Sequence, residues 1–191
     1  FDKPFTYEAT FADATLKEGV REQQSDHVGA VIGFKTTKGE IVHAKVASSF
    51  ISFEQASLNL KELGSDNFDT LVQKGKDVWN KELSKIEVEG GTLDQYRTFY
   101  SCMYRSLLFP RKFYEIDALG KVVHYSPYNG KVLPGYMFTD TGFWDTFRSL
   151  FPFLNLMYPT MSKEMQEGLI NAYKESGFFP EWASPGHRGC M

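Results

Sequence analysis

The sequence lacks the features that mark several common functional classes. Its 191 residues carry 21 Lys and Arg against 24 Asp and Glu, a net charge of −3. This balance argues against nucleic acid or an anionic membrane as the main partner. No apolar run approaches the roughly 18 residues that a membrane-spanning helix needs. The two cysteines, Cys102 and Cys190, do not make a disulfide framework, and the sequence leaves their pairing open.

Signatures of catalysis are also scarce. The chain has no Gly-rich phosphate loop and no legible Ser, His and Asp order. Its four histidines are His27, His43, His124 and His187, and their separations do not match the spacing of metal ligands. The chain begins at Phe1, without an initiator Met or a signal peptide, so we expect a processed or excised piece of a longer protein.

Aromatic residues are plentiful, at 16% of the chain. They supply core area and are also the usual platforms for sugars. Residues 1–53 show the alternation of strands, with strands expected over 5–11, 27–34 and 41–53 and a hairpin turn at 38–39. Because so few strands rarely close a sheet, we expect this part to be the end of a larger β-domain.

From Glu54 onward the hydrophobic period becomes that of helices. Gly64 and Gly177 are candidates for helix C-caps, and Asp66 and Thr92 for helix starts. Pro152 is expected to kink or shorten the helix over 143–158. A turn-rich segment over 110–141 is either a β-hairpin excursion or a binding loop. The helices are expected over 54–63, 66–83, 92–109, 143–158 and 161–175.

The segment 143–158 is apolar nearly all round, which predicts a buried helix, yet it contains three functional side chains. Trp144, Asp145 and Arg148 share one side of a helix at this spacing. A buried carboxylate needs donors. Spacing alone favours an internal ion pair between Asp145 and Arg148 over a site that binds polyol hydroxyls. Candidates for the helix N-cap are Thr139, Asp140 and Thr141.

Carboxylates next to tryptophans recur in loops at helix ends. The candidates are Asp140, Asp145 with Trp144, and Glu181 with Trp182. The Glu181-Trp182 pair could equally be a buried loop anchor. Sugar sites use this mixture, because an aromatic face stacks on C–H groups while a carboxylate and an Arg fix hydroxyls.

Several stretches resemble family 92 glycoside hydrolases, which are bacterial exo-acting α-mannosidases. The Trp-Asp-Thr-aromatic-Arg core within 139–152 and the Gly-x-x-x-Cys-Met ending of 177–191 are the more specific of these. The helix up to Tyr173 and the segment 96–110 are similar to the same family. The resemblance therefore covers about residues 92–191.

The resemblance implies an α+β protein of three parts. Residues 1–53 would be the end of an N-terminal antiparallel β-sandwich, and residues 54–91 a helical linker. Residues 92–191 would be the first helices of an incomplete (α/α)6 barrel.

The resemblance also implies an inverting exo-α-mannosidase, with α-1,2-linked mannosides of N-glycans or mannans as the favoured substrates. Such enzymes use a Glu general acid, an Asp general base and calcium. We expect both catalytic carboxylates beyond Met191, so this piece would hold no catalytic residue and no metal, and it would be inactive alone. Its partners would be α-mannoside glycans and the remainder of the same polypeptide. The location implied is periplasmic, cell-surface or secreted.

Substrate-binding residues follow from the resemblance one by one. Asp145 would hold the sugar in the −1 subsite, with Trp144 and Arg148 shaping its surroundings. A family loop near the cleft would contain Glu181, His187 and Arg188. Two alternatives stay open: a carbohydrate-binding or interaction module without catalysis, and another (α/α)6-barrel glycosidase. The sequence leaves open the linkage specificity and the oligomeric state.

Overall fold

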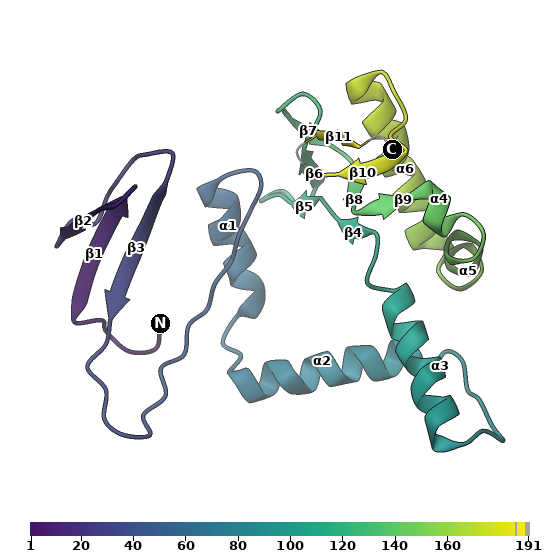
Figure 1. Ribbon diagram of the computed structural model, residues 1–191, viewed down its shortest axis with the longest axis horizontal. Coiled ribbons are helices and arrows are strands. Elements are labelled where there is room, and N and C mark those ends of the chain that lie inside the picture. Colours follow the sequence, from purple (N-terminus) through teal and green to yellow (C-terminus); the bar gives the residue numbers. More distant parts are fainter. Residues whose placement is uncertain (186, 190–191) are drawn as a thin grey trace. The chain divides into compact units, whose positions relative to one another are not determined.

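The computed structural model describes residues 1–185 and 187–189, and the chain divides into two compact units. The first unit is Phe1–Val46 and the second is Ala47–Met191. Figure 1 shows the elements of both units. The first consists of antiparallel strands and the second of helices and short strands. The predicted α+β class is thereby confirmed.

The first unit is built on a three-stranded antiparallel sheet in the order β2-β1-β3. Its strands are β1 (Tyr7–Ala12), β2 (Thr15–Glu18) and β3 (Val28–Gly33). Ala12 pairs with Thr15, so a two-residue turn joins β1 to β2. Asp13 in this turn has a φ of 51°, a left-handed conformation that Asp tolerates better than most residues.

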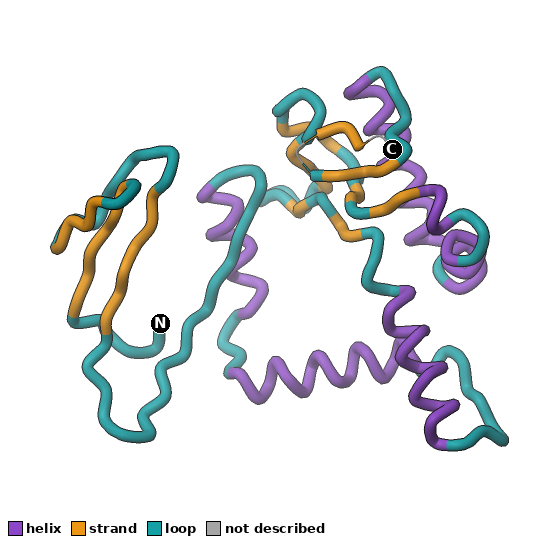
Figure 2. Tube along the Cα trace, viewed as in Figure 1, coloured by secondary structure: helices purple, strands orange, loops and turns teal. Residues whose placement is uncertain are grey.

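The strand expected over 41–53 does not form. Residues 34–52 carry no strand, and the segment between β3 and α1 is drawn as loop in Figure 2. Gly39 does make a turn, with a φ of 85°, but no hairpin follows it. A strand needs a partner strand for its backbone groups, and N–H groups of this segment instead bond to side chains that are distant in sequence. The His43 N–H donates to the Asp2 carboxylate at 2.8 Å, and the Phe50 N–H donates to Glu115 at 2.9 Å.

Three helices open the second unit, as predicted, and each begins at a side-chain cap. They are α1 (Phe53–Leu60), which continues into the 3₁₀ helix η1 (Lys61–Leu63), α2 (Phe68–Leu83) and α3 (Leu93–Ser106). Thr92 and Gln95 form a capping box at the start of α3. Asn67 caps α2, so Asp66 was the wrong residue, and the Asp66 carboxylate pairs with Lys74 instead.

The turn-rich segment 110–141 folds into short strands, which is the β-hairpin alternative. Strands β5, β6 and β7 form one antiparallel sheet, and β4 pairs with β8. Their bounds are β4 (Arg111–Lys112), β5 (Glu115–Ile116), β6 (Val122–Tyr125), β7 (Val132–Pro134), β8 (Phe138–Thr139) and β9 (Thr141–Gly142).

The apolar segment after β9 forms two helices, α4 (Phe143–Thr146) and α5 (Leu150–Met157), where one was expected. The break precedes Pro152, which lies in the first turn of α5, where a missing N–H costs nothing. The predicted burial is also wrong, because Trp144 and Leu156 are 63% and 80% exposed. No side chain caps α4, whose N-cap position is Gly142. Neither Thr139, Asp140 nor Thr141 therefore acts as a cap.

The last elements are α6 (Pro159–Ser176), β10 (Trp182–Ser184) and β11 (His187–Gly189). Helix α6 packs on α5 and on β8, and Phe138, Leu154 and Met165 form a buried cluster between them. The approach is close at Gly168, where a Cβ would lie 3.3 Å from the Met137 Cα. A larger residue would push α6 away from β8.

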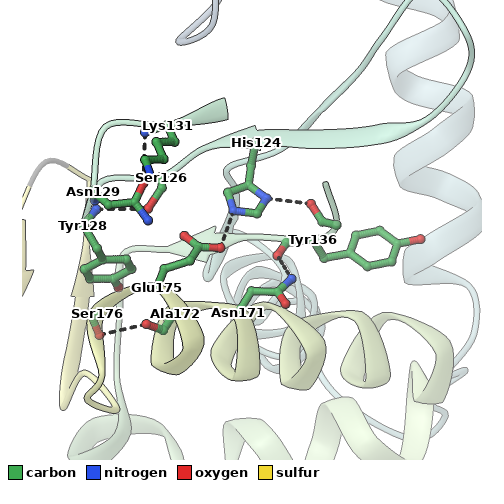
Figure 3. A network of polar contacts seen from close by, with 11 residues as sticks. His124, Ser126, Tyr128, Asn129, Lys131, Tyr136, Asn171, Ala172, Glu175 and Ser176 are labelled. Carbon is green, nitrogen blue, oxygen red and sulfur yellow. Dashed lines mark hydrogen bonds and ion pairs between the residues drawn. The ribbon is translucent and has the colours of Figure 1, made fainter. Parts of the chain in front are cut away.

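A buried ion pair fixes the β6–β7 hairpin to α6 (Figure 3). His124 is fully buried, with Nδ1 at 2.8 Å from the Gly135 carbonyl oxygen and Nε2 at 2.9 Å from Glu175. A carbonyl only accepts, so Nδ1 carries a proton. Burial raises the pKa of Tyr128 beside them, and the charge of Glu175 adds to this rise.

Candidate functional site

The candidate site lies where β9 runs into α4. Strand β9 pairs antiparallel with β10, with Gly142 opposite Trp182 and Thr141 opposite Ala183. The Phe143 N–H continues this pairing by donating to the Glu181 carbonyl at 3.2 Å. The pairing therefore places the first turn of α4 beside the residues that precede β10.

Trp144 and Arg148 lie together on the surface of this junction. The Arg148 guanidinium lies 5.1 Å from the centre of the Trp144 ring and 4.7 Å from that of Phe147. The side chains of all three residues are exposed. Such contacts contribute about 0.5–1 kcal/mol at exposed positions. The prediction that Trp144 and Arg148 share one side is confirmed.

Asp145 is exposed, and it does not form the ion pair with Arg148 that the spacing favoured. Among the described residues, no ion pair joins Asp145 to Arg148. Helix α4 ends at Thr146, so Arg148 lies beyond it and rests on the aromatic rings instead. The interpretation as an internal ion pair is therefore wrong, and the Asp145 carboxylate faces solvent.

Gly142 allows two functional groups to meet. A Cβ placed on Gly142 would lie 2.5 Å from Nε1 of Trp182 and 3.0 Å from Oδ2 of Asp145. Any side chain here would displace the indole or the carboxylate. The indole N–H, a donor, and the carboxylate, an acceptor, therefore both lie against Gly142.

Trp182 belongs to this site, whereas the sequence named it only beside Glu181, as part of a sugar site or as a loop anchor. It is half-buried, and it pairs across the sheet with Gly142 on one side and Gly189 on the other. The Glu-Trp dipeptide was the available signal, but a loop anchor explained it equally well. Only the pairing of β9 with β10 brings Trp182 to Asp145, 37 residues earlier in the sequence.

The remaining candidates lie on the same small sheet. Glu181 is exposed and directly precedes β10. In β11, His187 is opposite Ser184 and Arg188 is opposite Ala183. The backbone thus brings both residues to the sheet that carries Trp182, while their side chains lie outside the described part of the structure.

The described residues do not fit a calcium site. Calcium takes six to eight oxygen ligands, with carboxylates prominent among them. Within residues 1–185 and 187–189, no group of three or more His, Cys, Asp or Glu lies close enough to hold a metal ion. The described residues also contain no helix with the length and hydropathy that crossing a bilayer requires.

This geometry suits a polyhydroxylated ligand. The Asp145 carboxylate accepts hydrogen bonds, the Trp182 indole donates one, and Trp144 offers an aromatic face beside a guanidinium. A small number of placed polar groups among aromatic rings is the usual make-up of a small-molecule site.

Comparison with known proteins identifies the family to which this chain belongs. Residues 55–191 match the model of the glycosyl hydrolase family 92 catalytic domain. The chain therefore belongs to glycosyl hydrolase family 92. No curated protein matches it significantly.

Solved structures give the same assignment. The family GH92 inverting mannosidase BT2199 from Bacteroides thetaiotaomicron is 48% identical, with a TM-score of 0.87, over 98% of this chain and 26% of its own. The family GH92 α-mannosidase BT3965 from the same organism, in complex with mannoimidazole, has a TM-score of 0.78 at 24% identity. This second likeness, over 99% of this chain and 26% of the other, shows the fold alone. The chain spans about a quarter of the length of these relatives.

Proposed function

We propose that this chain is part of an inverting exo-α-mannosidase, to which it contributes substrate-binding residues. The observation that carries the proposal is the exposed Asp145 carboxylate beside Trp182 and Trp144, in a chain of glycosyl hydrolase family 92. The relative at 48% identity is described as an inverting mannosidase. The substrates proposed are terminal α-mannosides of N-glycans or mannans, with α-1,2 linkages favoured.

Each residue has a defined task in this proposal. Asp145 accepts hydrogen bonds from two hydroxyls of the sugar in the −1 subsite, because each of its oxygens can accept. Trp144 and Arg148 shape the adjoining surface. Glu181, His187 and Arg188 lie on the edge of the same site.

The architecture proposed for the whole protein extends beyond this chain. Residues 1–53 are assigned to the end of a β-sandwich, 54–91 to a helical linker and 92–191 to the start of an (α/α)6 barrel. The Glu general acid and the Asp general base are placed in the remainder of the polypeptide. Calcium is a property of the whole enzyme in this proposal, and its location is periplasmic, cell-surface or secreted.

The test is a direct assay of the full-length protein. We expect hydrolysis of an aryl α-mannoside, at least a hundredfold faster than of the matching aryl α-glucoside. Proton NMR during the first turnovers should show β-mannose as the initial product, because an inverting enzyme delivers water to the opposite face of the ring. Preference for the glucoside would favour another (α/α)6-barrel glycosidase, and binding without turnover would favour a carbohydrate-binding module.

A further inference from the structure

Asp140 has an unusual backbone conformation next to the candidate site. Its φ is 59°, and among the described residues only Asp13 and Asp140 combine a side chain with a positive φ. Asp140 joins β8 to β9 and lies two residues before Gly142. A left-handed conformation strains any residue that has a Cβ. Glycine would adopt this corner more easily, so what Asp140 adds is its carboxylate.

That carboxylate is held from two sides. Oδ2 of Asp140 lies 3.0 Å from Nε of Arg111 and accepts a hydrogen bond from the Thr139 hydroxyl at 3.3 Å. The Asp140 side chain is 21% exposed and the Arg111 side chain 65%, so solvent reaches the ion pair mainly from the side of Arg111. The Arg111 guanidinium is steadied further by the Phe109 ring, 5.4 Å away.

The corner at Asp140 is where two small sheets meet. On one side, Arg111 of β4 pairs with Thr139 of β8. On the other side, the Asp140 N–H donates to the Ala183 carbonyl at 2.7 Å, directly before Thr141 pairs with Ala183. Asp140 is therefore bonded to β4 through its side chain and to β10 through its backbone.

We propose that Asp140, held by Arg111, is a positioning residue for sugar binding. The ion pair with Arg111 fixes the corner between β8 and β9 and so sets how β9 lies on β10. This pairing decides where the Asp145 carboxylate and the Trp182 indole lie at Gly142. Asp140 contacts no sugar itself in this proposal. The activity test of this inference rests on the proposed function. The hydrogen–deuterium exchange test does not.

The test compares three variants of the full-length protein. Asp140→Gly keeps the left-handed backbone and removes the carboxylate. Asp140→Asn keeps an acceptor for Arg111 and tolerates the same conformation. Asp13→Gly is the matched control, because Asp13 also has a positive φ and pairs with a side chain, His27, at 3.3 Å.

On an aryl α-mannoside, we expect Asp140→Gly to lower kcat/KM at least tenfold, with a raised KM and a lowered kcat. Its Tm should stay within a few degrees of the wild type, because glycine relieves the strain. Asp140→Asn should stay within about threefold of the wild-type kcat/KM, and Asp13→Gly should match the wild type. Wild-type kcat/KM in Asp140→Gly, or a loss that only follows its unfolded fraction, would overturn the proposal.

Hydrogen–deuterium exchange separates this inference from the proposed function. The amides at positions 140 and 143 donate across to the chain near β10. We expect them to exchange at least tenfold faster in Asp140→Gly and at the wild-type rate in Asp13→Gly. If the wild-type protein cleaves no α-mannoside, the proposed function fails, while faster exchange still supports the positioning role. Unchanged exchange in Asp140→Gly would overturn that role whatever the activity.

Discussion

At the scale of single residues, the candidate site depends on a carboxylate that the fold leaves available. Asp145 follows a strand and lies in a one-turn helix, exposed, with its oxygen beside the space that Gly142 leaves open. Arg148, its expected partner, rests on Trp144 and Phe147 instead. Within the described residues the Asp145 carboxylate has no ion-pair partner, so it contributes little to stability there and is available to bind a ligand.

We expect Asp145→Asn in the full-length protein to reduce kcat/KM on an α-mannoside by about 10- to 100-fold. A hydrogen bond to a charged group contributes about 1.5–3 kcal/mol, and about 1.4 kcal/mol corresponds to a factor of ten. Asn accepts with only one oxygen and lacks the charge. The Tm should change little, because surface substitutions usually stay within about 0.5 kcal/mol. Steady-state kinetics and thermal melting of the same sample measure both.

The control for this substitution is Asp94→Asn. Asp94 is also an exposed acidic residue in the first turn of a helix, α3, and its side chain is 90% exposed. The control should retain full activity with an equally small change in Tm. A large fall in Tm for Asp145→Asn, with normal specific activity of the folded fraction, would contradict the substrate-binding role of Asp145 and indicate a structural one.

At the scale of elements, an ion pair and an aromatic ring join α2 to the start of α6. Glu82 and Lys85 pair at 2.6 Å, and the Lys85 ammonium lies 3.9 Å from the centre of the Tyr158 ring. The ion pair lowers the pKa of Glu82 and raises that of Lys85. Burial raises the pKa of the Tyr158 hydroxyl.

These shifts set the pH range in which the contact stabilises the fold. The lowered pKa of Glu82 gives stability that is present above its unfolded value of about 4.3 and is lost as the pH falls through the folded value. The raised pKa of Lys85 gives stability that is present below about 10.4 and is lost as the pH rises through its folded value. The pair therefore stabilises the chain across the neutral range and is lost at both extremes.

Glu82→Gln should accordingly lower the Tm at pH 7 by a few degrees at most, since partly exposed ion pairs contribute about 0–1 kcal/mol. As the pH falls below the unfolded value of about 4.3 and through the folded pKa of Glu82, the difference from the wild type should shrink, because protonation removes the charge of the wild-type carboxylate. Glu167→Gln is the control, because its pair with Lys163 is longer, at 3.7 Å, and more exposed. A deficit for Glu82→Gln that stays constant from pH 7 to pH 3 would contradict the electrostatic explanation.

At the scale of the whole molecule, the chain exposes large apolar side chains. Phe53 and Leu156 are 81% and 80% exposed, and Trp144 is 63% exposed. Exposed apolar patches promote association. Inverting hydrolysis also needs two carboxyl groups about 6.5–9.5 Å apart, and the function proposed above assigns both to the remainder of the protein.

We therefore expect the purified 191-residue chain to associate and to leave α-mannosides uncleaved, even with added calcium. Size-exclusion chromatography with light scattering should show species larger than a monomer, and an aryl α-mannoside should show no release above background. A monomeric peak with a sharp cooperative melt would contradict the first expectation. Turnover by highly purified chain would contradict the second.

The sequence by itself determined most helices, several of their caps and the family. Helix periods and caps are local, since residues three or four apart in the sequence meet in any helix. The capping box at Thr92 was therefore legible in advance, as was the C-cap at Gly177. Trp144 and Arg148 are also neighbours, although Arg148 lies beyond the end of α4, so a contact over the ring and not a shared helix brings them together.

The tertiary structure alone decided the strand pairings and the composition of the site. Whether residues 41–53 form a strand depends on a partner strand distant in sequence. The alternating pattern of the segment does not show whether such a partner pairs with it. The meeting of Asp145 with Trp182 at Gly142, and the left-handed corner at Asp140, likewise depend on how β9 lies on β10. Such pairings join residues far apart along the chain, so no local pattern encodes them.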